Sequence, residues 1–393
     1  MERCKVGRLS RKFKTIFIVL ILMMTICAGC SGKERDKTDI KEDKWLESAA
    51  LEAEESSEEL YKKALKEDIL IIYTVSTRIA EVKEYFEADY PGLSVEVRDI
   101  RSTNLVEEVE KNYNNGGFDC DLVLCNDNSG DYKTKLLDTG IVVQYIPWDI
   151  KEHMKEGLTG GIYSFVNEAE ILFYNSSKYE SVPIQNIWEL TDTKYKGTIY
   201  MPNPLRSFST YAFCVSLFQH EGEMKKAYEE YYGSKFEGGE DDAVTFFFKQ
   251  LAKNTVFTNS SDQVVEALGN GNADFGIAVS SKLRYADVGY KMQPIYNLNP
   301  FSGCRTSVSV SIARNSRNIN TAKLFIRYLL GEKDGKGRGY LPFSTLGTWS
   351  ARDDVEDANP VPIKEIDLMI PDQDYLIRER DSMEEFWTKL IGE

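Results

Sequence analysis

The stretch Ile69–Arg78, ILIIYTVSTR, decides the fold. Its first part, Ile69–Tyr73, is a near-continuous apolar run, which is typical of a strand covered on both faces of a sheet. Ile79, Val82 and Phe86 then recur at helical spacing. The polar VSTR turn therefore lies where a buried strand ends and a helix begins.

The next segments extend this pattern to β-α-β-α-β. Residues 93–100, LSVEVRDI, alternate like a half-buried strand, residues 104–113 have a helical pattern, and CDLVLC at 120–125 is again an apolar strand. This order predicts the α/β core of a doubly wound sheet, in which ligands gather at the carboxyl ends of the strands. The VSTR turn lies at such an end.

A second α/β segment follows further along the chain. Its expected strands and helices cover residues 197–202, 207–220, 264–268, 275–279, 307–314 and 321–330. The chain has 393 residues, 42% of them hydrophobic, so it can bury large cores and its length suits two domains better than one.

The first 29 residues have the pattern of a secretory signal. A basic head precedes an apolar run at residues 16–24, and the small Ala28 and Gly29 precede Cys30. The apolar run is shorter than the roughly 20 residues of a membrane-spanning helix, so cleavage is favoured over an uncleaved anchor. The Ala-Gly-Cys ending resembles a bacterial lipobox, which implies that Cys30 is lipidated and holds the chain on the extracellular face of the cytoplasmic membrane. Residues 30–67 would then form the lipidated cysteine, a tether and a short helix.

Charge and cysteine content limit the classes of partner. Residues 1–29 carry six basic side chains and one acidic one, so their removal changes the net charge from −15 to −20. Such a surface disfavours nucleic acid. The cysteines after Cys30 show no metal-ligand spacing, and we expect core thiols, no metal and no cofactor. They are Cys120, Cys125, Cys214 and Cys304.

Several motifs together carry a resemblance to a known family. They are ILIIYTVSTR (69–78), YFEADYPGLSVEV (85–97), FDCDLVLCND (118–127), ILFYN (171–175), IWELTDTKYKGTIYMPNP (187–204), ADFGIAV (273–279) and NINTAKLFIRYLL (318–330). With them the chain from about Glu58 to Glu393 resembles bacterial extracellular solute-binding proteins of ABC transporters, in the branch of ferric-ion and hexose-phosphate binders. The run Trp188–Ile199 is the most specific, because that branch marks the entry to its second lobe similarly.

The resemblance implies a periplasmic binding protein-like fold of type II. Two α/β lobes would be joined by crossing strands near residues 168–175 and 292–300, with a ligand cleft between them and hinge closure on binding. Lobe 1 would combine residues 68–170 and 300–393, and lobe 2 would cover 171–299. The expected partners are a small-molecule ligand and an ABC permease, and we expect a monomer.

Two turns suggest what the cleft would hold. The VSTR turn and the NPLRSFST stretch (203–210) each combine arginine, hydroxyls and a helix start, whose free N–H groups and dipole favour phosphate or carboxylate. We therefore predict an anionic, preferably phosphorylated, ligand, although serine and threonine before a helix are also ordinary caps. In hexose-phosphate members, related loops bind the phosphate, which implies that Ser280 and Ser281 meet sugar hydroxyls. Asn126, which follows the third strand, either bonds a ligand hydroxyl or caps a turn. The predicted ligand-binding residues are Ser76, Thr77, Arg78, Asn126, Arg206, Ser207, Ser209, Thr210, Ser280 and Ser281.

The sequence also bears on three other functions. A ferric-ion binder of the same fold is one alternative, but SSKLRY (280–285) lacks the adjacent tyrosines of that branch, and Tyr285 stands beside Lys282 and Arg284, whose charge opposes a cation. A sensor that presents its closed form to a membrane histidine kinase is another, because sensing and delivery need the same cleft. An enzyme is not expected, since the chain has no nucleophile elbow, phosphate-binding Gly-rich loop or His-Glu-x-x-His motif.

Overall fold

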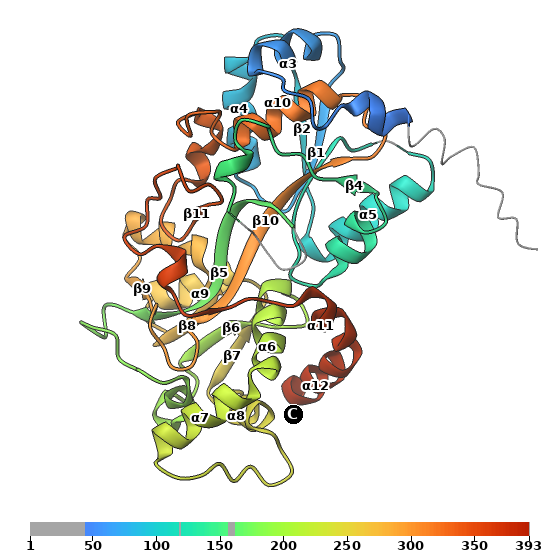
Figure 1. Cartoon of the computed structure of the whole chain (residues 1–393). Coiled ribbons are helices and arrows are strands. Elements are labelled where there is room, and N and C mark those ends of the chain that lie inside the picture. Colours follow the sequence, from blue (N-terminus) through green and yellow to red (C-terminus); the bar gives the residue numbers. More distant parts are fainter. Residues whose placement is uncertain (1–43, 118, 156–161, 393) are drawn as a thin grey trace, which may run out of the picture. The chain divides into compact units, whose positions relative to one another are not determined.

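The strands join in one twelve-stranded sheet in the computed structural model, which describes residues 44–117, 119–155 and 162–392. The main path of the sheet runs β2-β1-β3-β10-β5-β8-β6-β7 (Figure 1). Residues 51–393 form one compact unit, and residues 44–50 belong to another, helical over 44–49. No helix within the described ranges is long and apolar enough to cross a membrane.

Two groups of parallel strands form the ends of this path. The first strand group consists of β1 (Leu70–Thr74), β2 (Val95–Asp99) and β3 (Leu122–Asn126). The second strand group consists of β6 (Ile199–Pro202), β7 (Thr255–Thr258) and β8 (Phe275–Val279). Each has the β-α-β connectivity that the apolar runs predict, because parallel neighbours need a crossover helix between them.

Two long strands connect the groups. In β5 (Ser164–Asn175), the residues up to Ile171 pair with β10 and those from Glu170 on pair with β8. In β10 (Gly303–Ala313), the residues from Val308 on pair with β3, while the earlier ones pair with β5. Both are antiparallel to their neighbours in these pairs. These crossing strands are therefore the elements that join the two groups.

The position of the second crossing differs from the sequence prediction. Residues 292–294 form the short strand β9 (Met292–Pro294), which pairs with β5, and the crossing itself is made by β10. The first crossing is where the sequence predicts it, within β5. The lobe boundaries themselves stay a prediction.

Helices cover the strands of both groups. Those that follow strands of the first group are α4 (Ile79–Asp89) and α5 (Ser102–Asn114), and those of the second group include α6 (Phe208–Gln219) and α9 (Ser261–Gly269). Helix α6 is buried along most of its length, from Thr210 to Leu217, which agrees with its mainly apolar sequence. The other helices are α3 (Ser57–Ala64), α7 (Glu221–Tyr232), α8 (Ala243–Leu251), α10 (Ile319–Leu329), α11 (Gln373–Arg378) and α12 (Arg380–Gly392). The remaining strands are β4 (Val142–Val143), β11 (Trp349–Ser350) and β12 (Leu368–Met369).

The C-terminal helices contact both parts of the sheet. Arg380 binds Asp131, in the loop after β3, at 2.9 Å. The hydroxyl of Tyr211, in α6, donates to the backbone oxygen of Leu376 at 2.7 Å, and the Trp387 ring packs on Phe248 of α8 with centroids 4.8 Å apart. Helix α12 thus packs against elements of the second group, although the sequence assigns residues 300–393 to lobe 1.

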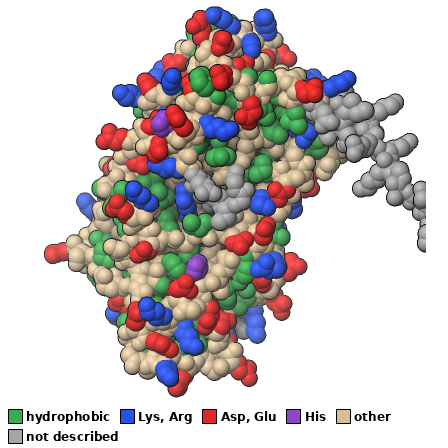
Figure 2. Space-filling view, in the orientation of Figure 1, with side chains coloured by type: hydrophobic (Ala, Val, Ile, Leu, Met, Phe, Trp, Pro, Cys, Tyr) green, Lys and Arg blue, Asp and Glu red, His purple; other side chains and the backbone are tan. Residues whose placement is uncertain are grey.

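Two sequence predictions concern thiols and the leader. All four cysteines after Cys30 are buried free thiols, which confirms the prediction of core thiols. The expected signal segment, and the lipidation of Cys30, lie outside the described residues. Over the face shown in Figure 2, side chains of both charge signs are interspersed.

Candidate binding cleft

An open cleft of about 1100 Å³ is lined from both strand groups and from both crossing strands. The first group contributes the turns after β1 and β2 and the end of β3. The second contributes the turns after β6, β7 and β8, and the crossing strands contribute Glu168, Thr306 and Val308. The carboxyl ends of the parallel strands meet there, which is where ligands of open α/β sheets bind.

Four helices begin at this cleft. The residues at the starts of α4, α5, α6 and α9 are among those that line it. Ser207 caps α6 and Ser260 caps α9 through their side chains, whereas α4 and α5 have no side-chain cap. The first N–H groups of α4, those of Ile79 and Ala80, donate to the carbonyls of Ser76 and Thr77, so α4 favours an anion through its dipole. The first N–H groups of α5 are not occupied by a capping side chain, and together with the helix dipole they favour an anion.

Most of the predicted ligand-binding residues line the cleft. Ser207, Thr210 and Ser280 do not, because their hydroxyls are used inside the protein. Ser207 Oγ accepts from the Thr210 N–H, Thr210 Oγ1 donates to Glu170 Oε1 at 2.7 Å, and Ser280 Oγ donates to the Gly347 carbonyl at 2.6 Å. The residues that do line it are Ser76, Thr77, Arg78, Asn126, Arg206, Ser209 and Ser281.

Arg78 lines the cleft with its charge already paired. Its Nη2 forms an ion pair with Glu168, and the two side chains are only 15% and 9% exposed. Its Nη1 donates to Thr348 Oγ1 at 3.3 Å, and the guanidinium lies 4.3 Å from the centre of the Phe343 ring. The guanidinium thus connects the start of α4 to a crossing strand and to the segment before β11. The VSTR motif alone could not show this, because all three partners are distant in sequence.

Sequence reasoning missed other cationic residues of the cleft. Arg101 lies at the start of α5, and Lys282 and Arg284 lie in the 3₁₀ turn Ser280–Val288 that follows β8. The available signal is their position directly after strands. In the sequence, Lys282 and Arg284 indicate only charges that oppose a metal beside Tyr285. Asn126 Oδ1, at the end of β3, is buried and accepts no hydrogen bond from the described residues.

Glu170, on the crossing strand β5, is a fully buried carboxyl behind the start of α6. Burial raises the pKa of this carboxyl, hydrogen bonds from Thr210 and Ser209 oppose the rise and the nearby Glu168 adds to it, so that the pKa lies at about 7. Its second oxygen, Oε2, has no hydrogen-bond partner in the described structure. The folded protein therefore favours the protonated form of this group.

We expect Glu170→Gln to stabilise the protein at alkaline pH. A carboxyl whose pKa is raised from its ordinary 4.5 to about 7 lowers stability as pH rises between these values, because the unfolded state loses the proton first. Above pH 7 the full penalty persists, and glutamine removes it. The free energy of unfolding should rise by about 3 kcal/mol at pH 8 and change little at pH 4.5. Urea denaturation at both pH values measures this, with the exposed Glu84→Gln as control; equal effects at both pH values would contradict it.

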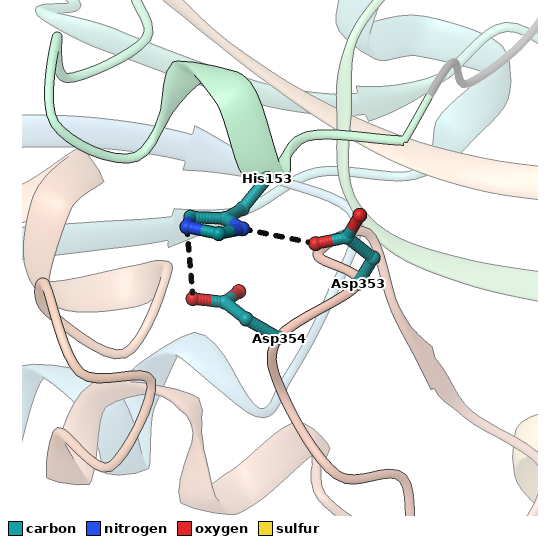
Figure 3. Close-up of side chains that lie close together, drawn as sticks. All are labelled: His153, Asp353 and Asp354. Atoms are coloured by element: carbon teal, nitrogen blue, oxygen red, sulfur yellow. Dashed lines mark hydrogen bonds and ion pairs between the residues drawn. The ribbon is translucent and has the colours of Figure 1, made fainter.

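One cluster outside the cleft has metal-ligand residue types. Among the described residues, His153, Asp353 and Asp354 could share an ion (Figure 3). The imidazole Nδ1 lies 3.0 Å from Asp353 and Nε2 lies 3.8 Å from Asp354, which also pairs with Arg352 at 2.7 Å. The two imidazole nitrogens face different carboxylates, and a guanidinium adjoins one of these. The cluster therefore fits a set of polar contacts that hold the turn Lys151–His153 against the C-terminal segment.

Solved structures of similar fold include binding proteins for different ligands. The crystal structure of iron-bound HitA from Pseudomonas aeruginosa matches with a TM-score of 0.64 and 14% identity, over 82% of this chain and 99% of HitA. The periplasmic binding protein AfuA from Actinobacillus pleuropneumoniae, with exogenous fructose-6-phosphate bound, matches with a TM-score of 0.63 and 19% identity, over 83% of this chain and 99% of AfuA. The substrate-binding protein of an ABC transporter from Agrobacterium tumefaciens matches with a TM-score of 0.62 and 13% identity, over 83% and 94% of the two chains. These similarities show the expected type II binding-protein fold.

The sequence itself matches a family model. No curated protein matches the chain. The model for bacterial extracellular solute-binding proteins matches residues 81–365, which include the starts of three of the four helices at the cleft. This family consists of binding proteins, in agreement with the expectation that the chain is not an enzyme. The chain belongs to the family of bacterial extracellular solute-binding proteins.

Proposed function

We propose that the protein captures a small anionic solute, preferably a phosphorylated one, in the cleft. The observation that carries this proposal is the charge of the cleft lining. Five cationic side chains line it against three carboxylates, an excess of two positive charges in a chain whose net charge is −15. Four helix starts add dipoles of the same preference.

The proposed mechanism is closure around the crossing strands β5 and β10. Residues at the starts of α4 and α5 would approach the ligand from one side, and those at the starts of α6 and α9 from the other. A ligand that contacts both sides stabilises the closed form because only that form offers all contacts at once. The donors supplied by the two sequence-predicted turns, Ser76, Thr77, Arg206 and Ser209, lie on opposite strand groups, which supports this arrangement.

The closed protein would deliver its solute to an ABC permease. A lipid on Cys30 would hold the protein beside that permease at the extracellular face of the membrane. A sensor that presents the closed form to a membrane histidine kinase would use the same cleft and the same movement. Radiolabelled solute uptake in cells with and without the protein separates these uses, because only delivery requires the protein for uptake.

Ferric-ion binding has less support in the cleft. Tyr285, the phenol considered for iron, has the Arg284 guanidinium 4.9 Å from its ring centre, and its hydroxyl donates to Asp262 at 3.5 Å. Asp262 is itself paired with Lys282 at 2.5 Å. A cation placed there would face two neighbouring positive charges.

A thermal-shift screen tests the proposed function. Purified residues 31–393 would be mixed with sugar phosphates, phosphonates, free sugars, polyamines, thiamine and ferric citrate, with chelator controls. A ligand that binds only the folded state, present at 100 times its Kd, adds about 2.7 kcal/mol to the free energy of unfolding and so raises Tm. We expect the rise with phosphorylated compounds. A rise with ferric ion alone, or with cations and no anion, would overturn the anionic assignment.

A further inference from the structure

We propose that Arg101, Arg206 and Arg284 together bind a dianionic phosphate monoester group, and that Arg78 is a positioning residue rather than a ligand contact. The inference rests on the proposed function, because it names the ligand class of the same cleft and the side chains that select it. It also reassigns the anion from the arginine of the VSTR turn to three arginines on three other loops.

The first step is the pairing of charges within the cleft. Arg78 pairs with Glu168, and Lys282 pairs with Asp262 at 2.5 Å. These two cations are compensated by carboxylates that also line the cleft. Their attraction for a bound anion is therefore weakened, because the carboxylate beside each cation repels the anion.

The second step is the state of the remaining arginines. In the described structure no carboxylate forms an ion pair with Arg101, Arg206 or Arg284. Arg206 Nη1 donates to the neutral Asn259 Oδ1 at 2.7 Å, and Arg284 Nη1 donates to the Ser281 backbone oxygen at 2.6 Å. These bonds orient the two guanidinium groups without cancelling their charge, and each group keeps further N–H donors for a ligand.

The third step is the position of these arginines on the chain. Arg101 is the N-cap residue of α5, a helix without a side-chain cap. Arg206 precedes α6 and Arg284 lies in the turn after β8, so both come from the second strand group. A ligand bound to all three therefore bridges the two groups, which couples the recognition of its charge to closure.

The fourth step is the number of charges. Among the lining residues outside these two ion pairs, there are three arginines and one carboxylate, that of Asp99. The cleft lining therefore carries an excess of two positive charges. A phosphate monoester carries about −1.5 to −2 at pH 7 and three acceptor oxygens, whereas a carboxylate carries one charge. Arginine also binds phosphate oxygens through two parallel N–H groups. Charge complementarity thus favours the dianion over a monocarboxylate of the same size.

Isothermal titration calorimetry with three probes of similar size tests the inference. The probes are glucose-6-phosphate, glucuronate and glucose, offered to residues 31–393 at constant ionic strength. We expect glucose-6-phosphate to bind at least tenfold more tightly than glucuronate, and glucose most weakly. Each of Arg101→Met, Arg206→Met and Arg284→Met should weaken glucose-6-phosphate by about 10- to 100-fold, the loss of a charged hydrogen bond.

Arg378→Met is the matched control. It removes the same unit of charge and the same side-chain type, but from an exposed arginine that does not line the cleft, so we expect less than a threefold change. Lysine at position 101 or 206 should recover part of the affinity, since it restores the charge without the planar fork. Circular dichroism and the Tm of the ligand-free variants check that each folds.

The outcomes separate this inference from the proposed function. If the wild-type protein binds none of these anions and no other anion of the thermal-shift screen, both are overturned. If it binds glucose-6-phosphate but the three arginine variants lose no more affinity than Arg378→Met, the inference alone is overturned. Equal affinity for glucuronate and glucose-6-phosphate would likewise reject the dianion while leaving an anion-binding cleft in place.

Discussion

Replacing Arg78 by methionine is expected to lower the free energy of unfolding by about 3–5 kcal/mol. The substitution leaves Glu168, which is 9% exposed, as a charge without its ion-pair partner on a crossing strand. It also removes the guanidinium from the Phe343 ring and from Thr348. Removal of one partner from a buried pair is costly because the remaining charge stays desolvated.

The double variant Arg78→Met/Glu168→Gln should recover most of this loss, since neither position then carries a charge. Urea denaturation of the wild type, both single variants and the double variant forms a double-mutant cycle that isolates the pair. Lys62→Met is the control, because Lys62 pairs with Glu58 at 2.6 Å while both side chains are at least 67% exposed, and it should change the free energy of unfolding only slightly. A double variant as unstable as Arg78→Met would contradict the assigned role.

Replacing Gly347 by alanine is expected to cost about 3–4 kcal/mol. Gly347 has φ +79°, and a Cβ there would lie 1.8 Å from the Ser280 backbone oxygen. Ser280 also donates its hydroxyl to the Gly347 carbonyl at 2.6 Å. The added methyl group must therefore displace the backbone at Ser280 and Ser281, and Ser281 lines the cleft. Ligand affinity should fall together with stability.

Gly271→Ala separates the two causes of that loss. Gly271 has φ +83°, but a Cβ there would meet no atom within 4 Å. It reports the conformational strain alone, about 1–2 kcal/mol, and it lies outside the cleft. Thermal and urea denaturation of both variants give the difference that belongs to the clash with Ser280. Equal losses at the two glycines would show that this contact does not constrain the cleft wall.

Local sequence patterns predicted much of the α/β core. The apolar run Ile69–Tyr73 overlaps β1, and the helical spacing that begins at Ile79 coincides with α4. These elements are readable because their periodicity reflects burial on two faces of a sheet or one face of a helix. The crossing by β10 was assigned to residues 292–300 instead, since strand pairing across the molecule depends on distant partners and leaves no local pattern.

The candidate site was predictable only in part, because its contacts also depend on partners that are distant in sequence. The turns after β1 and β6 were recognised because hydroxyls and arginine stand between a strand and a helix. Ser280 and Thr210 fit that pattern equally well, yet their hydroxyls bond to Gly347 and Glu170 inside the protein. Arg101 carries no comparable motif, and only the assembled sheet brings it to the cleft lining.

By itself the sequence determined the α/β class, the order of the strand-forming segments and the helix starts that follow them. Each of these features follows from the pattern of residues that are close to one another in the sequence. The tertiary structure alone decided which charges are free, because a charge is compensated by whatever lies beside it in space. Arg78 and Glu168 are 90 residues apart in sequence, and their pairing leaves the excess of positive charge on Arg101, Arg206 and Arg284.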